Sequence, residues 1–204
     1  LRRPLPRGFA SRLLDRRVLA LRRRGKYLLA DLDDGWTWLI HLGMSGRLVM
    51  APRPAPPRGR HDHVSVTTDE AVELRFNDAR RFGLMDLARR ADLDSHPLFK
   101  HMGPEPLEPS FTGAALAARL KGKKAPIKSA LCDQRVVAGI GNIYASEALF
   151  RAGISPRRSS ASVQGERADR LVAAVRGVLN DALAAGGSSL RDYVRASGEV
   201  GFFQ

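Results

Sequence analysis

Short apolar runs separated by turn residues dominate the first half of this sequence and leave it little choice of fold. The runs cover residues 18–21, 27–32, 36–40, 63–67 and 72–76. Asp33-Asp34-Gly35 is typical of a hairpin turn, and the stretch from Pro52 to Arg60, with four prolines and three arginines, indicates a solvated loop. The pattern predicts antiparallel strands, so we expect the first half to be all-β.

The second half has a different period. Ala, Leu and Arg recur at helical spacing past Pro106, and helices are predicted over residues 112–120, 128–132, 143–152 and 166–185. Prolines punctuate the chain between Asp92 and Glu108, so we expect the boundary there, with a β part over 1–98 and a helical part over 99–204. The predicted fold class is α+β, an antiparallel β-sandwich followed by an α-helical subdomain.

The net charge of the chain limits the classes of partner that we expect it to bind. Thirty-four Lys and Arg against 21 Asp and Glu give a formal net charge of +13 and a pI near 11.0, which favours a polyanionic partner. No run approaches the ~18 apolar residues of a membrane-spanning helix, so nucleic acid is preferred to a membrane. The single cysteine, Cys132, excludes an internal disulfide, and we expect a buried thiol and a reducing cytoplasm.

A glycine-rich turn between two predicted helices is the most specific local pattern. Gly139 and Gly141 allow the backbone to approach a ligand, and Asn142 could cap the helix that follows. The amides of that helix would receive a phosphate, which Lys128 could also reach. The alternative is a helix–turn–helix connection without any ligand.

The stretch from Gly139 to Glu147 resembles the helix-two-turn-helix signature of the formamidopyrimidine-DNA glycosylase and endonuclease VIII family. Six further segments agree with that family in order and spacing: 23–28, 41–46, 61–64, 78–83, 103–107 and 186–190. The resemblance therefore covers nearly the whole chain.

The resemblance implies particular roles in the β part. Lys26 matches a strand lysine that faces the lesion and assists β-elimination; an exposed strand lysine is the alternative. Met44, Arg80 and Phe82 match the trio that fills the void left by an extruded nucleotide. Core packing is the alternative for Met44 and Phe82.

Further residues are implied to contact DNA or the lesion. The DNA-binding positions are His61, Arg80, Lys123, Lys128, Gly141, Asn142 and Tyr144. The loop that closes over the lesion would contain Tyr193, Arg195, Ser197 and Gly198. His61 and His63 could suggest metal ligands, but no third ligand is near in sequence, so we expect no metal site, and His63 is expected to be structural.

The activity that the resemblance implies is base-excision repair. Such an enzyme excises oxidised purines, 8-oxoguanine and formamidopyrimidines, from duplex DNA and nicks the abasic site by β,δ-elimination. Two alternatives remain open: a non-catalytic DNA-binding module, and an endonuclease VIII-like glycosylase for oxidised pyrimidines. We expect damaged double-stranded DNA as the partner, no membrane, a monomer, and a cytoplasmic, nucleoid-associated location in a bacterium.

Two features of the family are not found in these 204 residues. One is the N-terminal Pro-Glu stretch, whose proline amine is the nucleophile. The other is a four-cysteine zinc finger. We therefore expect no cofactor in this segment and one zinc ion in a full-length relative. Our hypothesis is that the 204 residues alone bind DNA weakly and have no lyase activity.

Overall fold

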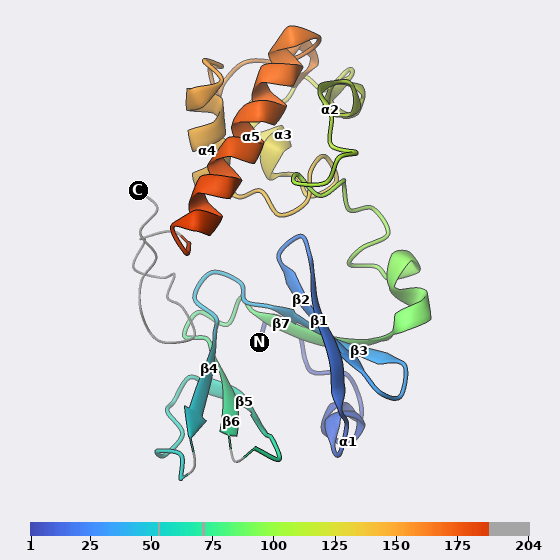
Figure 1. Ribbon diagram of the computed structural model, residues 1–204, viewed down its shortest axis with the longest axis vertical. Helices are drawn as coiled ribbons and strands as arrows, with labels where there is room; N and C mark the ends of the chain where they lie inside the picture. Colours follow the sequence, from blue (N-terminus) through green and yellow to red (C-terminus); the bar gives the residue numbers. More distant parts are fainter. Residues whose placement is uncertain (53, 71, 188–204) are drawn as a thin grey trace. The chain divides into compact units, whose positions relative to one another are not determined.

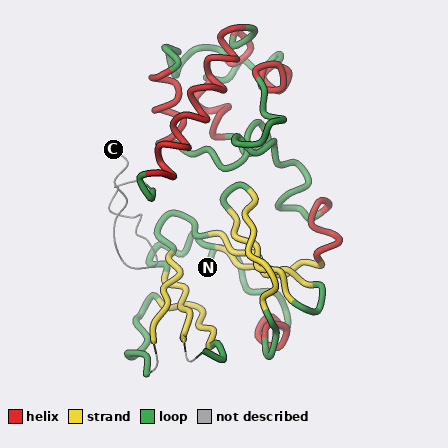
Figure 2. The backbone as a smooth tube through the Cα atoms, viewed as in Figure 1, coloured by secondary structure: helices red, strands yellow, loops and turns green. Residues whose placement is uncertain are grey.

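The computed structural model describes residues 1–52, 54–70 and 72–187 and shows two structural units, one built on Leu1–Leu93 and the other on Asp94–Ala184 (Figure 1). Strands dominate the first unit and helices the second (Figure 2). The α+β fold class predicted from the sequence is confirmed. No helix within the described ranges combines the length and the apolar character needed to cross a membrane.

The first unit contains two antiparallel sheets. Its strands are β1 (Val18–Arg24), β2 (Tyr27–Leu32), β3 (Trp36–His41), β4 (Arg47–Pro52), β5 (Asp62–Thr67), β6 (Val72–Asn77) and β7 (Leu84–Arg89). One sheet has the order β1-β2-β3-β7 and the other the order β4-β6-β5. The five predicted strands are all present, whereas β4 and β7 lie outside the predicted runs.

Apolar side chains from both sheets share one core. Ala30, Trp38 and Ile40 contribute from the first sheet and Phe76 from the second, and all four are buried. Alternate residues of a strand point to opposite faces, so these positions align on the inner face of each sheet. Burying a side chain of this size stabilises the fold by roughly 1.5–3 kcal/mol. The two sheets therefore pack as the predicted sandwich.

The prediction that the first half is all-β was wrong in two places. A short helix, α1 (Phe9–Leu13), precedes the strands, and a 3-10 helix, η1 (Arg90–Ser95), follows them. Phe9 is the one buried residue of α1, so the helix has no amphipathic period that a sequence could reveal. Its ring packs edge-on against Trp38, with ring centroids 6.2 Å apart, and so covers the core.

A group of ion pairs around the buried Arg75 lies on the second sheet, on the face opposite to Phe76. Arg75 is buried, and its guanidinium donates to Glu73 Oε2 at 3.0 Å and to the carbonyl oxygens of Pro56 and Pro57. These bonds hold the proline-rich loop against β6. Arg75, through its hydrogen bond, lowers the pKa of Glu73 to about 2, against the opposing effect of burial.

The second unit is a set of helices around its own core. They are α2 (Gly113–Leu120), α3 (Ile127–Cys132), α4 (Asn142–Arg151) and α5 (Glu166–Ala184), with a 3-10 turn, η2 (Ser160–Ser162). Thr112 caps α2 by accepting the Ala115 N–H at 3.1 Å. Helix α5 packs against α2 and α4, and each of the four predicted helices is confirmed to within one residue at either end.

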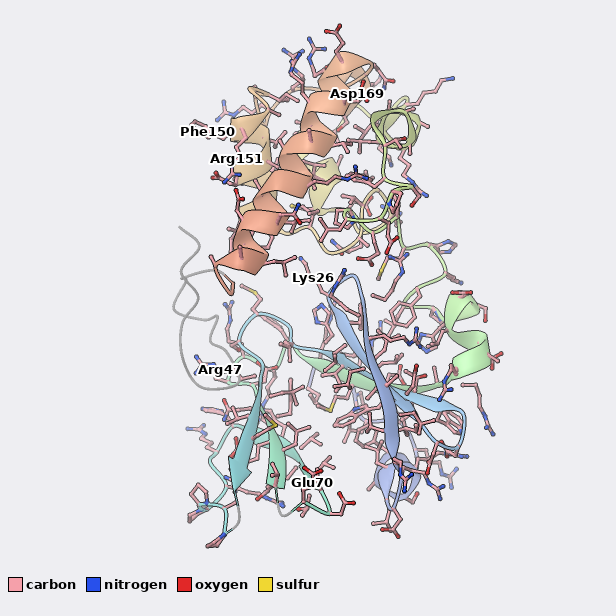
Figure 3. The ribbon with its side chains drawn as sticks, viewed as in Figure 1. Lys26, Arg47, Glu70, Phe150, Arg151 and Asp169 are labelled. Carbon is pink, nitrogen blue, oxygen red and sulfur yellow. The ribbon has the colours of Figure 1, made fainter. Side chains whose placement is uncertain are left out.

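We predict that acid weakens the first unit through Glu73. Its folded pKa of about 2 lies below the ordinary 4.5, so its contribution is complete above pH ~4.5 and is lost as the pH falls toward 2. Glu73→Gln should lower the urea midpoint at pH 7, and the difference from the parent protein should shrink at pH 3, as measured by circular dichroism. Glu70→Gln, at an exposed turn position (Figure 3), is the matched control. A Glu73→Gln deficit that is the same at both pH values contradicts this assignment.

Candidate nucleic-acid interface

A buried carboxylate, Asp78, joins two loops of the first unit. It is 0% exposed; its Oδ1 accepts the Ser45 hydroxyl at 2.7 Å and its Oδ2 accepts the Gly83 N–H at 2.7 Å. Ser45 Oγ in turn accepts the Arg80 N–H at 3.1 Å. Hydrogen bonds to a charged group are worth roughly 1.5–3 kcal/mol each. The loop after β3 and the loop after β6 are therefore fixed to each other.

The two loops also touch through their backbones. Gly43 has φ +70°, and a Cβ there would lie 2.5 Å from the carbonyl carbon of Phe82. Real Cβ atoms do not approach backbone so closely, so this contact requires glycine. At Gly83, a Cβ would lie 2.4 Å from the Phe76 ring. Glycines thus allow the loops to meet directly above the core.

Three exposed side chains stand on these fixed loops. Met44 is 50% exposed and Phe82 is 44% exposed, although both are apolar. The Arg80 guanidinium carbon lies 5.1 Å from the centroid of the Phe82 ring. The loops hold their backbones from beneath, so these side chains are not used for core packing. Such a set can fill an apolar gap and present a cation beside it.

Lys26 lies at the tip of the β1–β2 hairpin (Figure 3). It is the second residue of the Gly25-Lys26 turn rather than a strand residue, and it is exposed. Gly25 has φ +57°, the conformation that a type II′ hairpin needs at this position. The turn carries the ammonium group beyond the end of the sheet.

His41 is a residue of this region that sequence reasoning missed. Its ring centroid lies 4.8 Å from that of Tyr27, and its Nδ1 accepts the Gly43 N–H at 3.0 Å. Burial first, then the charges of Lys26 and Arg2, lower the pKa of His41. The ring is therefore neutral at pH 7 and links the Lys26 turn to the Met44 loop. Its place at the head of the glycine-flanked loop was the available signal.

The two other histidines in the pattern are tied to Asp78. His63 Nε2 lies 2.8 Å from the carbonyl oxygen of Asp78, which gives this side chain a structural bond. The carbonyl oxygen of His61 accepts the Asp78 N–H at 3.0 Å, and the His61 side chain is half-buried at the start of β5. Both residues therefore lie next to the loop that carries Arg80.

Arg81 differs from its neighbours on the loop in its backbone conformation and in the surface that it lines. It is one of two non-glycine residues with positive φ in the described ranges, at +58°. Together with His63 and the segment Leu1–Leu5 it lines a shallow hollow of about 510 Å³. Arg2 donates its N–H to the Gly83 carbonyl at 2.7 Å, which anchors that segment beside the same loop. Arg80 and Arg81 are consecutive in sequence but thus lie on different surfaces.

In the second unit, one glutamine side chain shapes the glycine turn. Gln134 Oε1 accepts the Gly139 N–H at 2.7 Å, and Gln134 Nε2 donates to the carbonyls of Ile140 (2.9 Å) and Cys132 (3.1 Å). Gly139 has φ +79°. The Gln134 side-chain amide therefore holds the connection between α3 and α4 in its conformation through these three hydrogen bonds.

The start of α4 differs from the expectation. Gly141, in extended conformation, is the N-cap residue and its lack of a side chain leaves the helix without a side-chain cap; Asn142 is the first helical residue. The Asn142 side chain is exposed, and its Oδ1 accepts from Cys132 Sγ at 3.6 Å. Cys132, expected to be buried, is half-buried. The start of α4 therefore has no side-chain cap, which is the arrangement that suits an anion at a helix N-terminus.

The remaining candidates of the second unit lie around this turn in sequence. Lys128 is half-buried on α3 and Tyr144 is half-buried on α4. Lys123, also half-buried, adds to the lowering of the pKa of Asp133, which Arg135 causes chiefly through its hydrogen bonds. Helices α3 and α4 pack against each other.

Two expectations from the sequence cannot be assigned to residues that the structure describes. Tyr193, Arg195, Ser197 and Gly198 lie outside the described residues. Among the residues that are described, no group of three or more His, Cys, Asp or Glu side chains could hold a metal. The zinc finger implied by the resemblance therefore has no fitting ligand set among them.

Comparison with known proteins gives consistent likenesses. The family model described as the formamidopyrimidine-DNA glycosylase N-terminal domain matches residues 1–85, and the one described as the H2TH domain of the same glycosylase matches residues 102–194. The formamidopyrimidine-DNA glycosylase of Rhodospirillum centenum is 55% identical over 214 residues, covering 100% of this chain and 74% of the relative. That of Acidiphilium cryptum is 54% identical over 204 residues, covering 100% and 73%.

Solved structures of Fpg proteins are also similar to this chain. The MutM (Fpg) protein of Thermus thermophilus superposes with a TM-score of 0.83 at 41% identity, covering 92% of this chain and 69% of that protein. The Lactococcus lactis Fpg, in complex with DNA containing an abasic site, superposes with a TM-score of 0.85 at 30% identity, covering 95% and 72%.

We predict that Gly43→Ala separates the two loops. Its Cβ collides with the Phe82 backbone, and we expect a loss of roughly 1–3 kcal/mol in the free energy of unfolding, measured by urea denaturation. Gly35→Ala is the control, because Gly35 has a similar φ of +80° and nothing within 4 Å of the added Cβ. It reports the backbone strain alone. Equal losses in the two variants would show that the Gly43–Phe82 contact is unimportant.

Proposed function

This chain belongs to the formamidopyrimidine-DNA glycosylase family, and from that premise we propose how its residues serve DNA repair. Its function is that of a repair glycosylase acting on oxidised purines, with the AP lyase activity characteristic of the family. The oxidised-pyrimidine alternative is not favoured, since the relatives described above are all formamidopyrimidine-DNA glycosylases.

The single observation that carries the proposal is the pair of loops bonded to Asp78. When a damaged nucleotide leaves the duplex, the base stack loses a partner, and unstacking costs a few kcal/mol. Met44 and Phe82 are exposed apolar groups on a rigid support, so they can occupy the gap without a preceding loop rearrangement. Arg80, above the Phe82 ring, can donate to the base left unpaired.

Lys26 is proposed to assist elimination at the abasic sugar. Its ammonium lies at a hairpin tip, at the end of the sheet where His41 and the Met44 loop begin. The neutral His41 ring positions this end by bonding the Gly43 N–H. We assign His41 a positioning role and Lys26 the role of a group that touches the substrate.

Phosphate binding is assigned to residues of both units. In the first unit the proposed contact is His61. In the second, the N–H groups at Gly141 and Asn142, which no side chain caps, would receive a phosphate, and Lys123, Lys128 and Tyr144 are proposed as further contacts. The net charge of +13 supports this assignment, because neutralising backbone phosphates releases counterions.

Three further assignments rest on family membership and composition. Tyr193, Arg195, Ser197 and Gly198 are proposed to close over the lesion. The protein is proposed to act as a monomer on the nucleoid, in the bacterial cytoplasm.

Replacement of Phe82 should test the void-filling role. Phe82→Ala is expected to weaken binding to a duplex with an abasic analogue about five- to 150-fold, because stacking on a base is worth ~1–3 kcal/mol. Binding to the undamaged duplex should change less than twofold, as measured by fluorescence anisotropy. Phe150→Ala is the control, since Phe150 is 82% exposed on α4 (Figure 3). If the two variants lose affinity alike, Phe82 does not fill the void.

The phosphate contact at Lys128 predicts a salt effect. Lys128→Gln should weaken binding to damaged and undamaged duplexes equally and reduce the slope of log K against log salt by ~0.9. Lys100→Gln, at an exposed position in the same unit, should leave the slope unchanged. An unchanged slope for Lys128→Gln would remove this lysine from the interface.

A further inference from the structure

A basic hollow lies at the end of the first sheet opposite to the proposed DNA-facing loops. Strand β2 runs from the Lys26 turn to Asp33-Asp34, β3 runs back to the Met44 loop, and β7 begins after Phe82. Figure 1 shows α1 at the far end of these strands. Six residues at ~3.3 Å each separate the two ends by about 20 Å. One phosphate cannot contact both ends.

The hollow has the size and lining of a small anion site. Its volume is about 310 Å³, near the lower limit of ligand pockets. It is lined by Arg7, Gly8, Ser11, Arg12, Arg16 and Asp34. The lining therefore contains three arginines and one aspartate.

Two acidic groups near the hollow, Asp33 and Asp34, are already engaged. Asp34 Oδ1 accepts the Trp36 N–H at 3.2 Å, which fixes the β2–β3 turn. Asp33 lies 3.8 Å from Arg16, and both side chains are exposed. Within the described ranges no ion pair involves Arg7 or Arg12. The lining of the hollow therefore carries more positive than negative charge, three arginines against one aspartate.

Trp36 holds part of this charge in place. The Arg12 guanidinium lies over its ring, 4.4 Å from the centroid, and the Arg89 guanidinium lies at 4.6 Å. Cation–π contacts of exposed groups are worth ~0.5–1 kcal/mol, so Arg12 loses less freedom when it binds an anion. Two cations already cover the ring, which makes it a poor platform for stacking a base. Recognition here falls on an anionic group rather than on a nucleobase.

We propose that Arg7, Arg12 and Arg16 form a second anion site that binds a phosphate group, separate from the lesion-facing surface. A guanidinium presents paired N–H groups that match two phosphate oxygens. The Ser11 hydroxyl at the rim donates to the Gly8 carbonyl oxygen at 2.9 Å, so the arginines supply the donors of the site. The phosphate can come from a nucleic-acid backbone or from a small phosphorylated compound.

Nuclear magnetic resonance of the whole 204-residue chain tests the site locally. The chain has two tryptophans, so its two indole N–H signals can be assigned with one Trp36→Phe variant. Inorganic phosphate should shift the Trp36 signal saturably and leave that of the buried Trp38 unchanged. Sodium chloride at equal ionic strength should not produce this shift.

Variants separate the site from general charge. Arg7→Gln/Arg12→Gln should raise the apparent Kd for phosphate at least tenfold, and Arg7→Gln alone, which leaves the Arg12–Trp36 contact intact, severalfold. Arg157→Gln/Arg170→Gln, two exposed arginines of the second unit, is matched in charge and should change it less than twofold. Equal Kd values in all variants, or an equal shift with chloride, overturn the proposal.

A duplex arm identifies the source of the phosphate. Displacement of inorganic phosphate by an undamaged 12-base-pair duplex would assign the site to a nucleic-acid backbone. Phosphate binding that the duplex does not disturb would assign it to small phosphorylated compounds. Neither result depends on Phe82, so this test stands apart from that of the lesion-facing loops.

Discussion

The Asp78 carboxylate accepts hydrogen bonds from two loops that are distant in sequence, and the exposed side chains above it depend on those bonds. Its neighbours supply a hydroxyl and a backbone N–H, so the charge is compensated by donors rather than by a cation. A cationic side chain beside Asp78 would need additional space beneath the two loops. With neutral donors on Asp78, the guanidinium of Arg80 remains at the surface, over the Phe82 ring.

In the proposed function, the two units recognise DNA by different physical means. The first would use side chains: a thioether, a ring and a guanidinium on loops that are hydrogen-bonded to each other. The second would use the backbone, because Gly141 leaves the first turn of α4 without a side-chain cap and Gln134 fixes the turn before it. The first arrangement suits a gap of defined shape, and the second suits a phosphate, which every nucleotide carries.

Much of the fold could be predicted from sequence because its signals are local. Alternation and the Asp33–Gly35 turn defined the hairpins, and helical spacing defined the four helices to within a residue. The short helix at Phe9 could not be predicted, since one buried residue makes no period. The role of Asp78 was also invisible, because its partner Ser45 is 33 residues away and neither residue type alone indicates the contact. Lys26 was singled out by resemblance and Asn142 first as a helix cap after the glycine turn, but Lys26 lies in a turn rather than a strand and Asn142 is the first residue of the helix rather than its cap.

The Gln134 amide has a consequence for the lifetime of the protein. Its nitrogen faces two carbonyl oxygens and its oxygen faces one N–H, so the side chain is used in a single orientation. Hydrolysis of that amide to a carboxylate, a slow chemical change in ageing proteins, would place a negative charge against two acceptors. The same charge would stand behind a turn intended for phosphate. Deamidation of Gln134 alone would therefore disturb the proposed phosphate site, although every residue proposed to contact DNA would be unchanged.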